Sequence, residues 1–253
     1  MPNSLLWSRT EGIGQTVVFL HGFMESSTMW SHLSLSNLNY QKVYIDLPGH
    51  GNSPLLTGEG EPSIAEMAAH VIATLNELNI TDFDVVGHSM GGYVALELKK
   101  YMSGCRRVVL LNSNFWEDSV EKKRDRVRVA DLALKAKDLL IHQAIPGLFF
   151  RKEYNSEHIQ FLIQEAKSML PESIAYSALA MRNRLDCTAL LVASPNDFLV
   201  LHGENDPLVT METMYQKMSR LPVRWVAIHQ AGHMAHIEES ETVKYEISHF
   251  LQS

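Results

Sequence analysis

The chain has few cysteines and no excess of basic charge. Only Cys105 and Cys187 occur in 253 residues, and their spacing fits neither a disulfide framework nor a paired-cysteine metal site, so we expect reduced, packed thiols. Lys and Arg total 22 against 29 Asp and Glu, a formal charge of -7. This charge gives no electrostatic support to nucleic-acid binding, and a neutral or cationic small-molecule substrate is easier to accommodate.

Long hydrophobic runs are also missing. The longest apolar segments have the length of a strand rather than of a membrane-spanning helix. Residues 1–9 lack the basic start and apolar stretch of a secretion signal. Both absences favour a cytoplasmic protein without a membrane partner. Hydrophobic residues make up 45% and charged residues 20% of the chain, which is ordinary for a folded globular protein.

Short apolar runs alternate with helical patterns through most of the chain. They lie near residues 16–20, 42–46, 83–87, 107–111, 198–202 and 224–229. Because these runs are continuously apolar, they are typical of strands in a parallel sheet that is covered on both faces. Residues 4–9 are expected to add an antiparallel edge strand. The alternation predicts an α/β fold with a mostly parallel central sheet flanked by helices.

Two helices are clear from their apolar spacing. One begins at Ile64 and continues to Leu78, and we expect Ser63 and Glu66 to form a capping box at its start, behind Pro62. The other closes the chain, with apolar residues at helical spacing between 243 and 251.

Residues 115–175 interrupt the alternation, because they show helical patterns and no convincing strand. We therefore predict a core formed by residues 1–114 and 176–253, with an inserted helical cap at 115–175. Pro146-Gly147 and Pro171 separate the expected helices. The charged run at 121–126 contains both signs and is interpreted as a solvated helix face rather than a docking patch.

Residues 87–92, Gly-His-Ser-Met-Gly-Gly, are the most informative stretch. They follow an apolar run and precede a helical pattern, so Ser89 is expected on a tight turn between strand and helix. Such a turn strains the backbone of the serine, and side chains at Gly87 and Gly91 would clash with neighbouring backbone. This arrangement is typical of a nucleophile elbow and predicts an enzyme.

Two further strand ends supply an acid and a histidine. Asp206 follows the run that ends near Gly203, and His233 follows the run at 224–229. A serine hydroxyl needs a base to remove its proton, and a neutral imidazole suits this role near pH 7. A carboxylate on the other ring nitrogen fixes the tautomer. We predict Ser89 as nucleophile, His233 as base and Asp206 as acid.

Each assignment has competitors. His229 and His236 lie near His233, and histidines also occur at positions 21, 50, 88 and 202. A metal set of the three neighbouring histidines is conceivable, but the spacing typical of zinc sites is missing, so we predict no metal and no cofactor. Among the acids, Asp197 precedes its strand and Asp84 begins another.

The order of these motifs resembles that of the α/β-hydrolase family. The resemblance extends through His21-Gly22-Phe23, the loop Asp46-Leu47-Pro48-Gly49-His50-Gly51-Asn52-Ser53, the elbow, Gly203-Glu204-Asn205-Asp206-Pro207, and Gly232-His233 with Glu238. It implies that the insertion forms a lid over the serine and that the backbone amides of Phe23 and Met90 form an oxyanion hole. The side chains of Phe23, Met90 and Trp116 are then expected to shape an apolar substrate pocket. The loop at 46–51 is interpreted as architectural.

Together these features predict a serine hydrolase that cleaves carboxylic esters or thioesters of small, fairly apolar compounds through an acyl-enzyme. Serine at position 89 argues against the dehalogenase and epoxide-hydrolase branches of the family, which use aspartate there. Carbon–carbon bond hydrolases, perhydrolases and small-acid synthases with the same triad stay open. So does a small-molecule receptor on the same fold, and the sequence leaves the oligomeric state undetermined.

Overall fold

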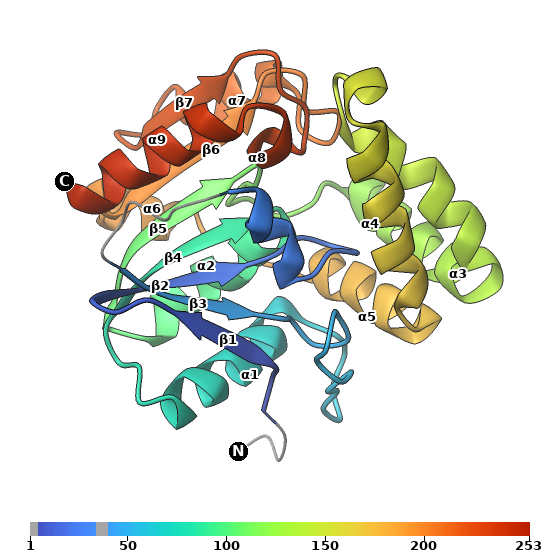
Figure 1. Cartoon of the computed structure of the whole chain (residues 1–253), viewed down its shortest axis with the longest axis horizontal. Helices are drawn as coiled ribbons and strands as arrows, with labels where there is room; N and C mark the ends of the chain where they lie inside the picture. Colours follow the sequence, from blue (N-terminus) through green and yellow to red (C-terminus); the bar gives the residue numbers. More distant parts are fainter. Residues whose placement is uncertain (1–4, 34–39) are drawn as a thin grey trace.

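The computed structural model describes residues 5–33 and 40–253. Within them, a seven-stranded sheet has the order β1-β3-β2-β4-β5-β6-β7 (Figure 1). Its strands are β1 (Ser8–Glu11), β2 (Gln15–Leu20), β3 (Tyr40–Ile45), β4 (Phe83–His88), β5 (Cys105–Leu111), β6 (Phe198–Gly203) and β7 (Arg224–Ile228). All neighbours pair in parallel except β1 and β3. The predicted α/β fold with a mostly parallel sheet is therefore confirmed.

Helices cover both faces of this sheet, which explains why its strands are continuously apolar. Neighbouring residues of β4 show the arrangement, since Val85 packs into the core on one face and Val86 into the core on the other. Helices α1 (Ile64–Glu77), α2 (Met90–Tyr101), α6 (Thr188–Ala193) and α7 (Met211–Met218) contribute to the first core. The short helix η1 (Ser27–His32), α8 (Ala235–Glu238) and α9 (Ser240–Gln252) contribute to the second.

The edge strand begins later than the sequence suggests. It was expected at residues 4–9, of which residue 4 lies outside the described part, and β1 instead runs from Ser8 to Glu11. The preceding residues use side-chain partners, because the backbone N–H of Leu6 donates to the Thr74 hydroxyl and that of Trp7 to the Ser53 hydroxyl. Pairing then continues to Glu11, directly before a turn at Gly12 with φ +77°.

Three helices form an insertion between β5 and β6, above the carboxyl ends of the strands (Figure 1). They are α3 (Val120–Ala144), α4 (Ser156–Ser168) and α5 (Pro171–Arg182), with the short helices η2 (Ile145–Leu148) and η3 (Lys152–Tyr154) after α3, and η4 (Pro195–Asp197) follows α6. The expected limit of the cap at residue 175 falls inside α5. This helix belongs to two cores, since Ile174 packs within the cap and Met181 packs in the core under the sheet.

The expected capping box at α1 is only half formed. The Ser63 hydroxyl accepts from the backbone N–H of Glu66 at 3.1 Å. The Glu66 carboxylate does not return to Ser63, but accepts from the backbone N–H of Gly58 and from the Tyr176 hydroxyl. The second contact joins α1 of the core to α5 of the insertion.

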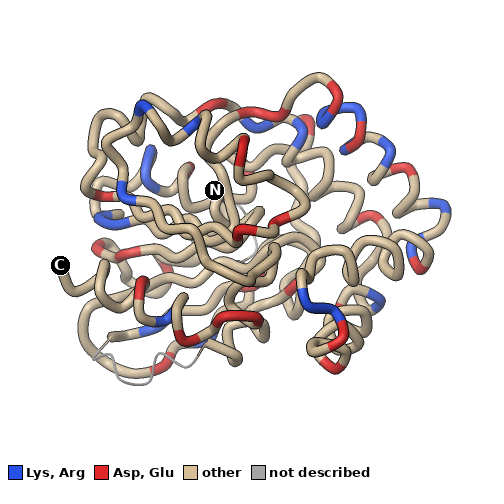
Figure 2. The backbone as a smooth tube through the Cα atoms, turned by 90° about the horizontal axis from the view of Figure 1, so that it is seen from above, with Lys and Arg blue, Asp and Glu red and all other residues tan. Residues whose placement is uncertain are grey.

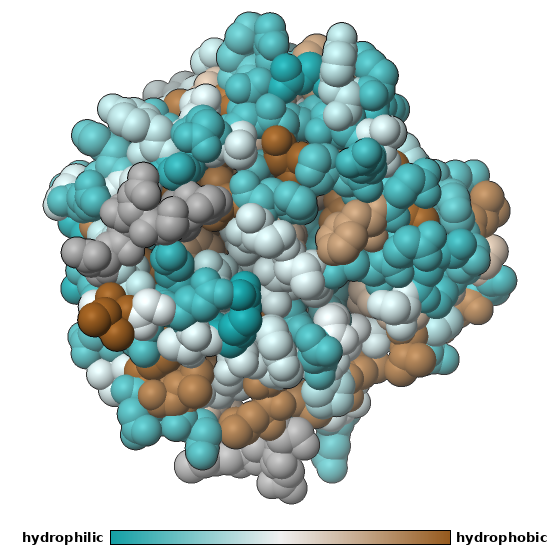
Figure 3. Space-filling model, viewed as in Figure 1, coloured by the Kyte–Doolittle hydropathy of each residue, from teal (hydrophilic) through white to brown (hydrophobic). Residues whose placement is uncertain are grey.

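The helices, the surface and the two cysteines agree with a folded globular protein. In the described ranges, no helix combines the length and the apolar composition needed to cross a bilayer. Figure 2 shows Lys and Arg interspersed with Asp and Glu along the chain rather than gathered by sign. On the face seen in Figure 3, hydrophobic side chains occur in small groups among hydrophilic ones. Cys105 and Cys187 are buried and form no disulfide with each other.

The contact between Tyr176 and Glu66 predicts that Tyr176→Phe destabilises the protein. Burial, reinforced by Glu66, raises the pKa of the Tyr176 hydroxyl, so it remains a donor to the carboxylate. Removing it should lower the free energy of unfolding by roughly 1.5–3 kcal/mol, the usual contribution of a hydrogen bond to a charged group. Urea denaturation measures the change. Tyr154→Phe is the control, because Tyr154 is 80% exposed, and equal stabilities of the two variants would contradict the prediction.

Candidate active site

Ser89 occupies the turn between β4 and α2 with strained backbone angles, φ 48° and ψ -114°. A Cβ atom at Gly87 would lie 2.4 Å from the carbonyl oxygen of Gly91, and one at Gly91 would lie 2.3 Å from that of Leu20. Both glycines are therefore required sterically, as the sequence predicted. The close approach at Gly91 also places the end of β2 directly against the elbow.

The structure brings three side chains from separate strand ends into one hydrogen-bonded row. The Ser89 Oγ lies 2.9 Å from Nε2 of His233, and Nδ1 of His233 lies 2.7 Å from the Asp206 carboxylate. Ser89 follows β4, Asp206 follows β6 and His233 follows β7. Asp206 and His233 are buried, whereas Ser89 is partly exposed to a cavity.

The Asp206 carboxylate is held in its ionised form. Burial raises its pKa, but the attraction and hydrogen bond of His233 outweigh burial, so the pKa of Asp206 lies below its usual range. The backbone N–H of Leu208 and the amide of Asn112 also donate to it, at 2.8 and 3.0 Å. The same Asn112 amide donates to the carbonyl of Gly232 at 3.0 Å and so positions the histidine loop.

A second buried pair, His88 and Glu25, holds the backbone of His233 in place. His88 lies 3.0 Å from the Glu25 carboxylate through Nδ1 and donates from Nε2 to the backbone carbonyl of His233 at 3.0 Å. Burial alone would lower the pKa of His88, but Glu25 raises it; burial would raise the pKa of Glu25, but His88 lowers it to about 2. Glu25 also accepts from the backbone N–H of Gly22 at 2.7 Å. The pair therefore connects the loops after β2, β4 and β7.

Two backbone donors expected near Ser89 are free. Met90 begins α2, so its N–H is one of the unsatisfied groups at a helix N-terminus. Phe23 follows the His21-Gly22 turn. Neither N–H donates to an acceptor in the part of the chain that the structure describes. Both are thus available to an oxyanion.

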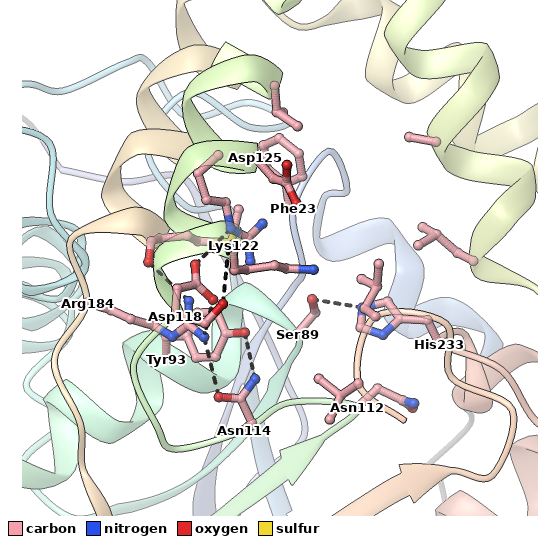
Figure 4. A pocket seen from close by; sticks show the side chains of 18 of the residues that line it. Phe23, Ser89, Tyr93, Asn112, Asn114, Asp118, Lys122, Asp125, Arg184 and His233 are labelled. Atoms are coloured by element: carbon pink, nitrogen blue, oxygen red, sulfur yellow. Dashed lines mark hydrogen bonds and ion pairs between the residues drawn. The ribbon is translucent and has the colours of Figure 1, made fainter. Parts of the chain in front are cut away.

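A cavity of about 490 Å³ lies between the core and the inserted helices. Ser89 and His233 line one side of it (Figure 4). Phe23 and Trp116 line the cavity as expected, but the Met90 side chain does not reach it and is fully buried in the core instead. The first residue of α2 therefore presents its backbone to the site and its side chain to the core.

Comparison with known proteins identifies the family. Residues 17–244 match the sequence profile described as "Alpha/beta hydrolase family". The chain belongs to this family. The chain is similar to the solved structure of a thermophilic esterase from Thermogutta terrifontis with malate bound. The two are 30% identical, and the match covers 98% of this chain and 93% of the other, with a TM-score of 0.88.

More distant matches extend the comparison. The enol-lactonase from Burkholderia xenovorans LB400 shares the fold at 20% identity, with a TM-score of 0.84 over 98% of this chain and 96% of the other. A curated protein from Escherichia coli (strain K12), 2-succinyl-6-hydroxy-2,4-cyclohexadiene-1-carboxylate synthase, is 38% identical over 80 residues. That alignment covers 32% of this chain and 31% of the synthase. It therefore spans only about a third of the curated relative.

The competing histidines of the alpha/beta hydrolase lie in other environments. His236 is fully buried, with both ring nitrogens unpaired among the described residues. His229 is exposed and pairs with Glu204 at 2.6 Å. His202 lies 3.9 Å from Asp206 and contacts the carbonyl of Val209 at 2.8 Å.

Over the described ranges, no group of three or more His, Cys, Asp or Glu side chains is placed to hold a metal ion.

The competing acids and the loop at 46–51 also have other partners. Asp197 pairs with Lys99 at 2.7 Å. Asp84, at the start of β4, accepts from the backbone N–H of Arg107 at 3.1 Å. Asp46 accepts from the backbone N–H of Ser27 at 2.8 Å, which agrees with an architectural role for its loop.

Several buried histidines predict that the protein loses stability in acid. Burial lowers the pKa of His50 to about 3 and also lowers those of His21 and His236. The unfolded chain protonates these rings as the pH falls below about 6.5, while the folded protein keeps them neutral. The unfolded state then binds more protons, so the free energy of unfolding should fall by about 1.4 kcal/mol per pH unit for each such ring.

Three further groups modify this dependence. The raised pKa of His88 acts in the opposite sense, since its contribution to stability is complete below about pH 6.5 and is lost as the pH rises through its folded pKa. The lowered pKa values of Glu25 and Asp206 add a further loss below about pH 4. Urea titrations between pH 8 and about pH 3.5 test the balance, and a stability that increased from pH 6.5 to pH 5 would contradict it.

Proposed function

We propose that the protein is a serine hydrolase that cleaves carboxylic esters through an acyl-enzyme. The observation that carries the proposal is the row of contacts from Ser89 Oγ to His233, 2.9 Å, and from His233 to Asp206, 2.7 Å, at the side of a cavity. A hydroxyl, an imidazole and an ionised carboxylate in this order are what activation of a serine nucleophile requires. The substrate is a small molecule that fits the cavity.

In the proposed reaction, Ser89 Oγ attacks the ester carbonyl as Nε2 of His233 takes its proton. The ionised Asp206 stabilises the imidazolium and fixes its orientation. The backbone N–H groups of Phe23 and Met90 bind the oxyanion, and each such donor contributes roughly 2.7–4 kcal/mol in comparable sites. His233 then protonates the leaving alcohol, and a water activated by the same imidazole hydrolyses the acyl-enzyme.

The relatives give further support. The structure at 30% identity is that of an esterase, and a lactone, the substrate class named for the enol-lactonase, is a cyclic ester. The synthase match involves only 80 residues and carries less weight. Carbon–carbon bond cleavage, perhydrolysis and ligand reception without turnover are the alternatives that the experiments below separate from ester hydrolysis.

Ser89→Ala should abolish covalent labelling and turnover without unfolding the protein. A fluorophosphonate probe should label the wild-type protein at Ser89, and short p-nitrophenyl esters should be hydrolysed over many turnovers. The variant should lose about 10⁴- to 10⁶-fold in kcat, because the nucleophile is removed. Circular dichroism provides the folding control. Retained labelling of the variant would identify another nucleophile, and single turnover by the wild type would favour the receptor.

His233→Ala should reduce kcat by roughly 10⁴-fold or more, because no base then accepts the serine proton. The matched variant is His229→Ala, four residues earlier, whose side chain is exposed and pairs with Glu204. It should keep kcat within about twofold, since surface substitutions of this kind have small effects. Steady-state hydrolysis of p-nitrophenyl esters compares the two. A larger loss in His229→Ala would exclude His233 as the base.

A further inference from the structure

A group of cations lies in the cavity away from the serine. Lys122 and Arg126 come from the first turns of α3, and Arg184 follows α5. Figure 4 shows Lys122 and Arg184 near Asp118 on one side, with Ser89 and His233 on the other. Asp118 pairs with both arginines, at 3.1 Å from Arg126 Nε and 2.8 Å from an Arg184 terminal nitrogen. Asp118 is therefore shared by the two arginines, and no ion pair joins it to Lys122.

The other carboxylates beside this group do not balance it. Glu117 and Asp125 also line the cavity. Glu117 is paired with Lys123 at 2.7 Å, and Asp125 is paired with Arg128 at 2.7 Å. Each therefore already has a cation outside the cavity lining. Of the three cations, Lys122 is left without an ion pair among the described residues, and Arg126 shares its carboxylate with Arg184.

The two arginines and the lysine differ in their free donors. Arg184 donates to the carbonyls of Trp116 and Met181, each at 3.1 Å, in addition to Asp118. Its donors are therefore used to hold together the segments that line the cavity. Arg126 uses only Nε, and its terminal N–H groups have no acceptor in the described ranges. The Lys122 ammonium likewise has no hydrogen bond or ion pair there. Guanidinium and ammonium groups with free donors are suited to a carboxylate.

The surroundings of Lys122 favour an anion beside its ammonium group. Burial, followed by the repulsion of Arg126, lowers the pKa of Lys122 from its ordinary value, and the attraction of Asp118 and Asp125 offsets this only in part. An anion at this position would offset both causes. The positive end of α3, whose first turn begins after Ser119 at the cavity, acts in the same direction.

We propose that the part of the cavity lined by Lys122 and Arg126 is an anion subsite, in which these two side chains bind a carboxylate of the substrate. The inference rests on the proposed function, because Ser89 must then cleave an ester whose own molecule carries that carboxylate. The substrate class is a half-ester of a dicarboxylic acid, or an ester of a hydroxy acid, with the anionic group on the acyl or the alcohol side. This anionic substrate differs from the neutral or cationic substrate that the overall charge of -7 suggested.

Substrate pairs that differ only in charge test the subsite. Monoethyl succinate is compared with ethyl 4-methylpentanoate, in which an isopropyl group replaces the carboxylate, and longer diacids extend the series. Acetyl esters of hydroxy acids place the carboxylate on the alcohol side. A pH-stat measures kcat/KM. We expect the wild-type protein to prefer at least one anionic ester by about tenfold or more over its neutral partner.

Variants at position 122 assign the preference to the subsite. Lys122→Met should lower the ratio of anionic to neutral kcat/KM by about tenfold, whereas Lys122→Arg should retain most of it, because the charge is kept. Lys135→Met removes the same charge from an exposed position of α3 outside the cavity lining and should leave the ratio unchanged. Turnover without a preference for anionic esters, or a preference that survives in Lys122→Met, would overturn the inference.

A binding measurement separates this inference from the proposed function. Calorimetric titration of the Ser89→Ala protein with succinate, glutarate and adipate needs no turnover. At least one dicarboxylate should bind, and Lys122→Met in the same background should weaken it by about tenfold. If no ester is hydrolysed, the proposed function fails, and this titration alone decides whether the anion subsite exists; absence of binding would overturn it.

Discussion

The buried pair of Glu25 and His88 is the interaction on which the site depends. It connects the loop that carries Phe23, the elbow that carries Ser89 and the loop that carries His233. Two opposite charges removed from water are stable only while both are present, and loss of one partner of such a pair typically costs about 3–5 kcal/mol. The pair therefore makes the positions of Phe23, Ser89 and His233 interdependent.

The parallel sheet fixes the positions of the other side chains of the site. Its strands end at one edge, and the turns that follow β4, β6 and β7 place Ser89, Asp206 and His233 there. Asn112, after β5, donates through its side-chain amide to Asp206 and to the carbonyl of Gly232, the residue before His233. Groups held by rigid strands and buried hydrogen bonds need little rearrangement when charge develops on a substrate, which is the basis of electrostatic stabilisation at such sites.

Sequence patterns predicted those features that depend on local chemistry. The strand runs, the glycines of the elbow and the start of α1 follow from short-range sterics and periodicity, and the structure agrees with them. Contacts between distant segments were not predictable in this way. Glu25 and His88 are 63 residues apart, and Glu66 turns from its own helix cap to Tyr176. Asn112 had one signal, a polar residue directly after an apolar run, and it was overlooked.

The charged run in α3 shows why composition alone was insufficient there. Its mixed signs indicate a solvated face, and Lys123 and Asp125 do form ion pairs near the surface, with Glu117 and Arg128. Lys122 and Arg126 lie on the side of the same helix that lines the cavity, a difference that only the packing of the helix against the core determines. Net charge describes the whole molecule, whereas a ligand responds to the few charges within its reach.

The shared packing of α5 has a consequence for how such proteins diversify. Because Ile174 belongs to the core of the cap and Met181 to the core under the sheet, the insertion cannot be exchanged as one module without opening the main core. A change of the substrate pocket that leaves the main core intact would therefore have to keep α5 and alter the helices that pack on it, α3 above all.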